Sequence, residues 1–191
     1  SMSLTEYRQF LTQHPPMSAP NNNATMVNMV GHRISFAVSE YLRHHKMTDR
    51  IRDFQWEFNL VNAPEANAWC MPGGKVVVYS GLLPVTADEA GLAFVMGHEI
   101  AHAVARHGNE RMSQMLLAET GGLALDLALA NKPAQTRAIF QTAYGIGSTV
   151  GVLLPYSRLH ESEADQLGMI FMAMAGYDPS AAPIVWERMI A

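Results

Sequence analysis

The chain contains the stretch Met96-Gly97-His98-Glu99-Ile100-Ala101-His102, which has the pattern H-E-x-x-H. On an α-helix, residues four apart lie on the same face, so this spacing predicts that the imidazoles of His98 and His102 point the same way. Two imidazoles placed in this manner can hold one zinc ion. Glu99 follows the first histidine and is therefore predicted to act as general base toward a water molecule held by the zinc.

The surrounding residues predict the helix that this motif requires. Apolar residues recur at helical spacing from Leu92 to Val104, and both histidines fall among them rather than on a charged face. The stretch Thr86-Ala87-Asp88-Glu89 has the pattern of a capping box, which predicts Thr86 as the N-cap. Taken alone, the short motif leaves an alternative, which is a pair of histidines packed on a half-buried helix without a metal.

A second acidic pattern lies downstream. Glu161 and Asp165 are four residues apart on a predicted helix that continues through Phe171, so both carboxylates share one face. Catalytic zinc commonly takes three protein ligands, and a ligating histidine usually donates its other ring N–H to a carboxylate. The pattern therefore predicts Glu161 as the third ligand and Asp165 as the partner of a ligating histidine. The alternative is that both carboxylates belong to an exposed acidic helix face. We interpret the neighbouring Glu163 in that way.

Three blocks of sequence resemble the M48 metallopeptidases, specifically the soluble bacterial branch related to the mitochondrial inner-membrane protease OMA1. These blocks are residues 67–74 with 81–83, residues 97–102 with 106–107, and residues 158–165 with Gly168. The resemblance covers almost the whole chain from Val27 onward. The metzincins are excluded, because their pattern requires glycine and histidine where this chain has Ala105 and Gly108.

The resemblance implies a zinc endopeptidase with one Zn²⁺ per chain. It implies that His98, His102 and Glu161 bind the metal and that Glu99 is the catalytic base. By similarity to thermolysin-like enzymes, Asp165 is expected to orient His98. The expected substrate and partner is a peptide or an unfolded protein.

The predicted fold class is α+β, a mainly helical zincin domain of the gluzincin type with a small antiparallel β-sheet next to the H-E-x-x-H helix. Alternating or β-branched residues predict strands in residues 53–60, 67–70 and 75–80. We expect residues 1–191 to form a single M48-like domain, with residues 1–23 as an N-terminal extension.

The second predicted strand is a candidate for substrate binding. In zinc peptidases of this general design an edge strand lies beside the cleft, and an extended peptide adds to it through backbone hydrogen bonds. The resemblance assigns this part to Asn67, Ala68, Trp69 and Cys70, with Cys70 itself as a bystander thiol. A plain structural hairpin is the alternative.

The oxyanion that develops during peptide hydrolysis also needs a hydrogen-bond donor. The sequence offers several candidates and does not choose among them. They are His107, Tyr156, Arg158, His160 and Tyr177.

Composition narrows the classes of function. The net charge is −4 and basic clusters are absent, so nothing favours a nucleic-acid partner. The single cysteine excludes an intrachain disulfide. Residues 138–157 contain no charged residue. We interpret them as part of a helical hairpin packed over the domain, with membrane contact or an oligomer surface as alternatives.

Location and biological role follow from the resemblance alone. It implies a periplasmic or membrane-anchored lipoprotein on the envelope side of a bacterium, acting in envelope protein quality control. Ser1-Met2 resembles a cloning remnant, so we expect natural terminal segments, including an N-terminal membrane tether, to be absent. The alternative function is a catalytically inactive, zinc-stabilised binding or chaperone-like module. Glu99 favours the enzyme, because a structural zinc site does not need it.

Overall fold

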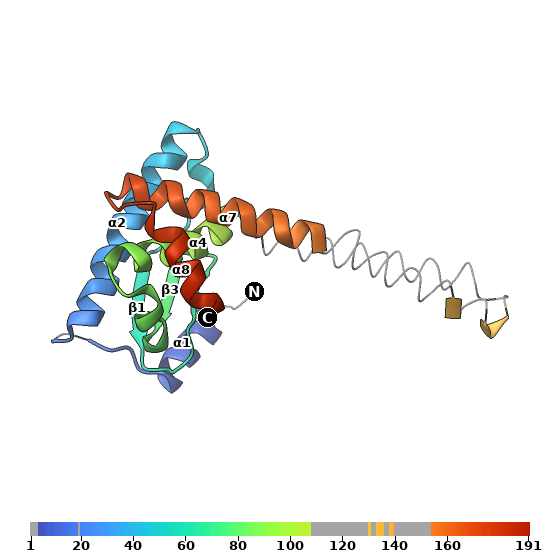
Figure 1. Cartoon of the computed structure of the whole chain (residues 1–191), viewed down its shortest axis with the longest axis horizontal. Helices are drawn as coiled ribbons and strands as arrows, with labels where there is room; N and C mark the ends of the chain where they lie inside the picture. Colours follow the sequence, from blue (N-terminus) through green and yellow to red (C-terminus); the bar gives the residue numbers. More distant parts are fainter. Residues whose placement is uncertain (1–3, 19, 108–129, 131–132, 136–137, 140–153) are drawn as a thin grey trace. The chain divides into compact units, whose positions relative to one another are not determined.

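The computed structural model describes residues 4–18, 20–107, 130, 133–135, 138–139 and 154–191. The chain forms two compact units, residues 1–105 with 163–191 and residues 106–162. The two borders fall at the end of α4 (Glu89–Ala105) and inside α7 (Leu154–Met174), and both helices are labelled in Figure 1. The predictions for residues 108–129 and 140–153, including most of the helical hairpin, lie outside the described residues. The single-domain organisation stays a prediction.

Helices precede and follow the three consecutive strands of a small sheet. In chain order the elements are α1 (Leu4–Gln13), α2 (Asn22–His44), the 3₁₀ turn Thr48–Ile51, β1 (Glu57–Val61), β2 (Ala68–Met71), β3 (Lys75–Tyr79), the 3₁₀ turn Ser80–Leu82, α3 (Leu83–Thr86), α4 (Glu89–Ala105), α7 (Leu154–Met174) and α8 (Ala181–Ile190). This arrangement confirms the predicted α+β class with a mainly helical domain.

The sheet is mixed, whereas we predicted an antiparallel sheet. Its strand order is β1-β3-β2, with β2 antiparallel to β3 but β1 parallel to β3. The hairpin of β2 and β3 turns at Gly73 and Gly74, whose positive φ angles of 106° and 88° suit glycine. The middle strand β3 therefore pairs in both senses, parallel with β1 and antiparallel with β2. Within the described chain, β2 is therefore an edge strand.

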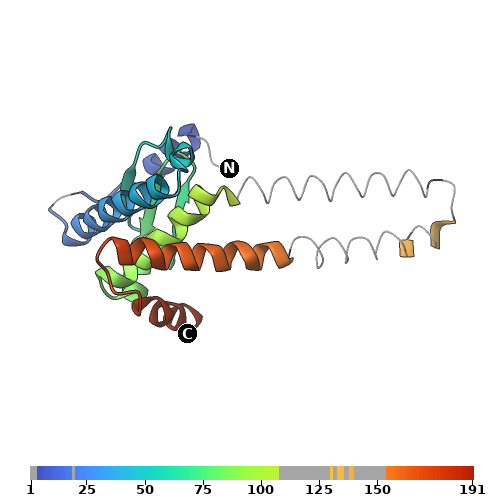
Figure 2. The same ribbon diagram turned by 90° about the horizontal axis from the view of Figure 1, so that it is seen from above.

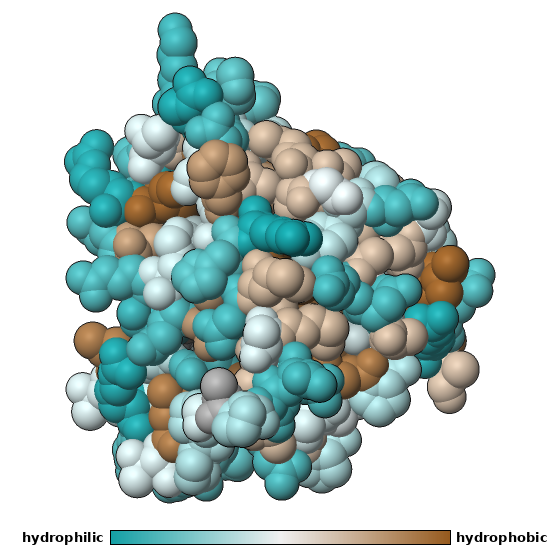
Figure 3. All heavy atoms as spheres, turned by 90° about the vertical axis from the view of Figure 1, so that its left-hand side faces the viewer, coloured by the Kyte–Doolittle hydropathy of each residue, from teal (hydrophilic) through white to brown (hydrophobic). Residues whose placement is uncertain are grey.

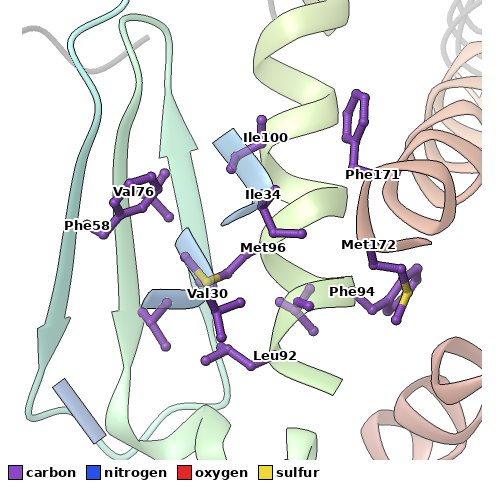
Figure 4. Close-up of a cluster of buried hydrophobic side chains, with 14 of the residues drawn as sticks. Val30, Ile34, Phe58, Val76, Leu92, Phe94, Met96, Ile100, Phe171 and Met172 are labelled. Atoms are coloured by element: carbon purple, nitrogen blue, oxygen red, sulfur yellow. The ribbon is translucent and has the colours of Figure 1, made fainter. Parts of the chain in front are cut away.

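Each face of the sheet covers a separate core. Val76 and Val78 of the middle strand point into the larger core, which α2 and α4 complete. Val77 points the opposite way and packs in a smaller cluster with Tyr7 of α1. Alternation along a strand produces this division, because successive side chains leave opposite faces. The α4 helix lies between the sheet and α7 in the larger core (Figure 4).

The motif helix α4 begins two residues later than the capping-box pattern predicts. Asp88, rather than Thr86, acts as its N-cap, with Oδ1 accepting from the Gly91 N–H at 2.9 Å. Thr86 is the last residue of α3, and its hydroxyl donates to the Leu83 carbonyl. The chain breaks between the two helices at Ala87, which has a φ of 64°. The prediction of Thr86 as N-cap is therefore wrong.

The α4 and α7 helices approach closely at two glycines. A Cβ atom on Gly168 would lie 2.9 Å from the backbone nitrogen of His98, and one on Gly97 would lie 3.1 Å from the Gly168 carbonyl oxygen. The absence of side chains at this crossing lets the two backbones pack together. One turn of α7 is consequently held directly against the start of the H-E-x-x-H motif.

The last helix, α8, packs on α4 and α3 (Figure 2). Its apolar face buries Ala182 and Val185. Arg188 donates from Nη1 to the carbonyl oxygens of Val85 and Thr86, both at 3.4 Å. The guanidinium thus binds the carbonyl end of α3, where positive charge is favoured.

The outer surface is that of an ordinary globular protein over the residues described. Hydrophilic side chains cover most of the face seen in Figure 3, and hydrophobic ones are scattered among them. None of the helices in the described ranges is both long enough and apolar enough to cross a membrane.

Candidate metal centre

Two histidines of α4 turn toward the same point. His98 and His102 lie one helical turn apart, and their Nε2 atoms are 3.2 Å from each other. His98 is buried, with 6% of its surface exposed, and His102 is half-buried. The predicted helical spacing therefore brings both imidazoles to one side of α4.

Asp165 of α7 binds the other nitrogen of His98. The distance from His98 Nδ1 to Asp165 Oδ1 is 2.9 Å. An ionised carboxylate can only accept, so Nδ1 carries the proton and donates it to this bond. The lone pair of His98 is then on Nε2, the atom that faces His102. The structure thus brings Asp165 to His98, and the role of Asp165 as partner of a metal-binding histidine stays a prediction.

Glu161 lies one turn before Asp165 on the same continuous helix. Ligand atoms of His98, His102 and Glu161 all lie within 4.8 Å of one another. Two ligands of a tetrahedral zinc ion, at the usual bond lengths, are separated by about 3.4 Å. Two imidazole nitrogens and one carboxylate oxygen are also the donor types that zinc takes in catalytic sites. The residues present fit a metal ion of this kind.

Glu99 is half-buried beside the first histidine and close to strand β2. Its carboxylate contributes to the environment of Cys70. Burial raises the pKa of the Cys70 thiol well above its ordinary value, and the negative charge of Glu99 adds to the effect. Cys70 Sγ donates to the Met71 carbonyl at 3.5 Å. The general base predicted from the sequence thus lies near the proposed substrate strand.

The four predicted substrate-binding residues differ in direction. Ala68 and Cys70 point toward the larger core that contains α4. Trp69 points to the other face, where its ring packs edge-to-face on Phe10 with centroids 5.2 Å apart. Asn67 is exposed, and its carbonyl accepts from the Tyr79 N–H at 3.0 Å. A role of these residues in substrate binding stays a prediction.

The candidates for the oxyanion donor lie in several settings. His107 and His160 are buried and stack on each other with ring centroids 4.3 Å apart. Arg158 is exposed, and Tyr156 lies in the first turn of α7. The Tyr177 hydroxyl accepts from Arg33 Nη1 at 3.3 Å. Their roles stay predictions.

A large groove lies on another part of the molecule. It has a volume of about 680 Å³ and runs between α2 and β1, with His32, Trp56 and Phe58 among its lining residues. None of the residues of the candidate metal centre lines it. The groove and the candidate metal centre are therefore separate sites.

Sequence reasoning missed one neighbour of the centre, Trp186 of α8. Its ring lies edge-to-face with the His98 ring, with centroids 5.6 Å apart and an interplanar angle of 78°. No local pattern reports a contact between residues so distant in sequence.

Comparison with known proteins decides the family. The sequence pattern of Peptidase family M48 matches residues 32–190. The chain belongs to this family. The match includes both motif helices, so the predicted M48 membership is confirmed, and it supports the class of metalloendopeptidase.

Three relatives illustrate the range of similar proteins. The M48 chain is 38% identical to the mitochondrial metalloendopeptidase OMA1 of Schizosaccharomyces pombe over 190 residues, which is 100% of this chain and 51% of the relative. It is 34% identical to the human mitochondrial metalloendopeptidase OMA1 over 161 residues, 80% of this chain and 30% of the relative. It is 33% identical to the beta-barrel assembly-enhancing protease of Escherichia coli over 140 residues, 71% of this chain and 28% of the relative. The chain thus spans about half the length of these relatives or less.

Proposed function

We propose that this M48 protein is a zinc-dependent endopeptidase that hydrolyses peptide bonds in unfolded proteins. The observation that carries the proposal is the convergence of His98, His102 and Glu161, whose ligand atoms lie within 4.8 Å. Family membership and the names of the relatives support it further.

The protein's own residues divide the work of holding the metal. His98 and His102 would bind through Nε2, and Glu161 through a carboxylate oxygen. Asp165 accepts the Nδ1–H of His98 and keeps that ring in the tautomer whose Nε2 carries the lone pair. When bound, zinc polarises the scissile carbonyl and supplies a nucleophilic water at neutral pH.

Glu99 is assigned to proton transfer. It follows His98 directly and is only half-buried, so its carboxylate is accessible to a water molecule at the centre. In the proposed reaction Glu99 removes a proton from the attacking water and passes it to the departing amine. A donor among the five oxyanion candidates would complete the site.

Strand β2 is the proposed position of the substrate. It is an edge strand of the sheet in the described chain, and Cys70 on it is close enough to Glu99 for the carboxylate to affect the thiol. An extended peptide that pairs with the backbone of residues 67–70 would pass alongside α4. Such binding recognises the peptide backbone through hydrogen bonds and therefore suits a substrate without folded structure.

We extend the proposal to envelope protein quality control, in a periplasmic or membrane-anchored location. The Escherichia coli relative is named as a beta-barrel assembly-enhancing protease, and the eukaryotic relatives as mitochondrial metalloendopeptidases. Those names describe the relatives, and the role reaches this chain only by analogy.

The decisive experiment compares cleavage of an unfolded protein by the wild type and by Glu99→Gln. We expect zinc-dependent cleavage by the wild type that falls about 10²- to 10⁴-fold in the variant, while zinc binding is retained. Glu40→Gln, at a half-buried position of α2 where the carboxylate pairs with Arg43, is the matched control and should cleave normally. Full activity of Glu99→Gln would refute the assignment of the base.

The alternative function is a zinc-stabilised binding or chaperone-like module without catalysis. The same experiment separates it from the enzyme. A wild-type chain that binds one zinc, suppresses aggregation of the unfolded protein and never cleaves it would favour the module.

A further inference from the structure

The His98 ring contacts Asp165, Trp186 and Phe94 as well as His102. Asp165 binds Nδ1 at 2.9 Å. Trp186 lies edge-to-face with the ring at 5.6 Å, and Phe94 lies one turn earlier on α4 at 6.1 Å. Trp186 and Phe94 also contact each other, with centroids 6.2 Å apart. The imidazole is thus held by one hydrogen bond and two aromatic rings.

These contacts restrain different motions of His98. A single hydrogen bond fixes the direction of Nδ1, but the ring can still tilt about the line joining Nδ1 to the Asp165 oxygen. Such a tilt would swing Nε2 away from His102. An indole packed against the ring opposes the tilt, because aromatic pairs favour particular relative orientations.

Trp186 is itself held in place by the docking of α8. Ala182 and Val185, which precede it in the helix, are buried at 2% and 1% exposure. Arg188 is bound to the carbonyl oxygens of Val85 and Thr86. The indole can therefore leave His98 only through a rotamer change or through displacement of the helix.

We propose that Trp186 is a positioning residue for the metal centre, which holds the plane of the His98 ring so that Nε2 stays directed at the metal. This inference rests on the proposed function, because it assigns a metal to His98. It gives α8 a part in the chemistry that neither family membership nor the H-E-x-x-H pattern assigns to it.

Two substitutions separate positioning from simple packing. Trp186→Leu keeps an apolar side chain but removes the aromatic ring, and Trp186→Phe keeps a ring. Trp56→Leu is the matched control, since Trp56 packs against Phe54 and Phe58 and lines the groove that contains none of the metal-centre residues.

The measurement is the affinity of each full-length variant for Zn²⁺ and Co²⁺ in competition with a chelator. We expect Trp186→Leu to bind both ions about 2- to 10-fold more weakly, the scale of one aromatic pair. It should also alter the visible absorption spectrum of the Co²⁺ form, which reports ligand geometry. Trp186→Phe should restore the affinity and the spectrum, whereas Trp56→Leu should change neither.

The outcomes distinguish this inference from the proposed function. Unchanged affinity and an unchanged Co²⁺ spectrum in Trp186→Leu would overturn the inference and leave the peptidase proposal standing. Equal losses in Trp186→Leu and Trp56→Leu would also overturn it, because they would show a general loss of stability. A wild-type chain that binds neither ion would overturn both proposals.

If Trp186→Leu does not fold, Trp186→Phe and the quenching of tryptophan fluorescence by Co²⁺ remain as tests. Quenching in the wild type should exceed that in Trp186→Phe, and equal quenching would contradict the contact.

Discussion

At the scale of single residues, His98 is the most constrained side chain of the candidate centre. It is almost fully buried, and its two ring nitrogens face different partners, Asp165 and His102. Burial without a hydrogen bond would be costly for a polar ring, so each contact both stabilises the fold and sets the tautomer. Losing either partner should therefore weaken metal binding as well as lower the stability of the fold.

The first prediction concerns Asp165. Replacement by asparagine keeps the size of the side chain but removes its charge, so the Nδ1–H of His98 loses a strong acceptor. We expect zinc affinity, measured by chelator competition, to fall about 10- to 100-fold, the usual effect of losing such a partner. Asp53→Asn, on an exposed loop, is the control and should bind zinc as the wild type does. Unchanged affinity in Asp165→Asn would assign Asp165 a purely structural part.

The second prediction concerns Cys70. Because burial and the nearby Glu99 charge raise the pKa of this thiol, it stays protonated in the folded chain at pH 8.5. Iodoacetamide, which reacts with thiolates, should label the folded chain far more slowly than the urea-unfolded chain. Glu99→Gln removes the smaller of the two causes and should speed the labelling slightly. Labelling at equal rates in the folded and unfolded chains would contradict the raised pKa.

The same shift affects stability at high pH. The folded pKa lies above the unfolded value of about 8.5, so the unfolded state gains by ionising as the pH rises through that value. The associated stability is complete below pH 8.5 and is lost progressively above it. In urea denaturation, the free energy of unfolding should fall less between pH 7 and pH 10 in Cys70→Ala than in the wild type.

At the scale of elements, the sequence predicted the motif helix correctly but misplaced its first residue and the pairing of the strands. The spacing of His98 and His102 was sufficient to place them on one face of a helix, since that relation is local. The N-cap was misassigned because Thr86 and Asp88 are both good caps, and the turn at Ala87 decides between them. The parallel pairing of β1 with β3 depends on which strand occupies the middle of the sheet, which alternation of side chains does not reveal.

The third prediction tests the crossing of α4 and α7. In Gly168→Ala the added methyl group would lie 2.9 Å from the His98 nitrogen, so the two helices must separate. We expect the free energy of unfolding in urea to fall by about 1–3 kcal/mol, as for other overpacked positions. Zinc affinity should fall as well, because Asp165 is on the displaced helix. Gln166→Ala, on the exposed face of α7, should change neither quantity.

At the scale of the whole molecule, the candidate centre joins elements that are far apart in the chain. His98 is 67 residues from Asp165, and Trp186 comes from the last helix. Local patterns predicted the two motif helices, and the donor types on them predicted that they meet at one metal, as the family resemblance also implied. The contribution of α8 was beyond both, because it arises from tertiary packing at a position with no distinctive motif.

The fourth prediction follows from this joining of distant elements. A metal that binds only the folded chain raises its stability, by about 2.7 kcal/mol at a free concentration of 100 times Kd. For a chain of this size we expect zinc to raise the melting temperature by roughly 5–10 °C, and a chelator to reverse the change. His102→Ala should abolish the zinc-dependent shift, whereas His45→Ala, at the exposed end of α2, should retain it. An equal shift in both variants would place the metal elsewhere.

The helix α1 bears on how this protein can be shortened. Tyr7 is fully buried in the smaller core, its hydroxyl donates to Glu57 Oε2 at 2.5 Å, and Phe10 packs on Trp69 beneath the edge strand. Trimming the chain to residues 24–191, a natural choice for a protein engineer who wants the peptidase region alone, would uncover the apolar underside of β2 and β3. The trimmed protein should then aggregate during purification even with every metal ligand intact. A minimal version of this protein therefore needs to begin before Leu4.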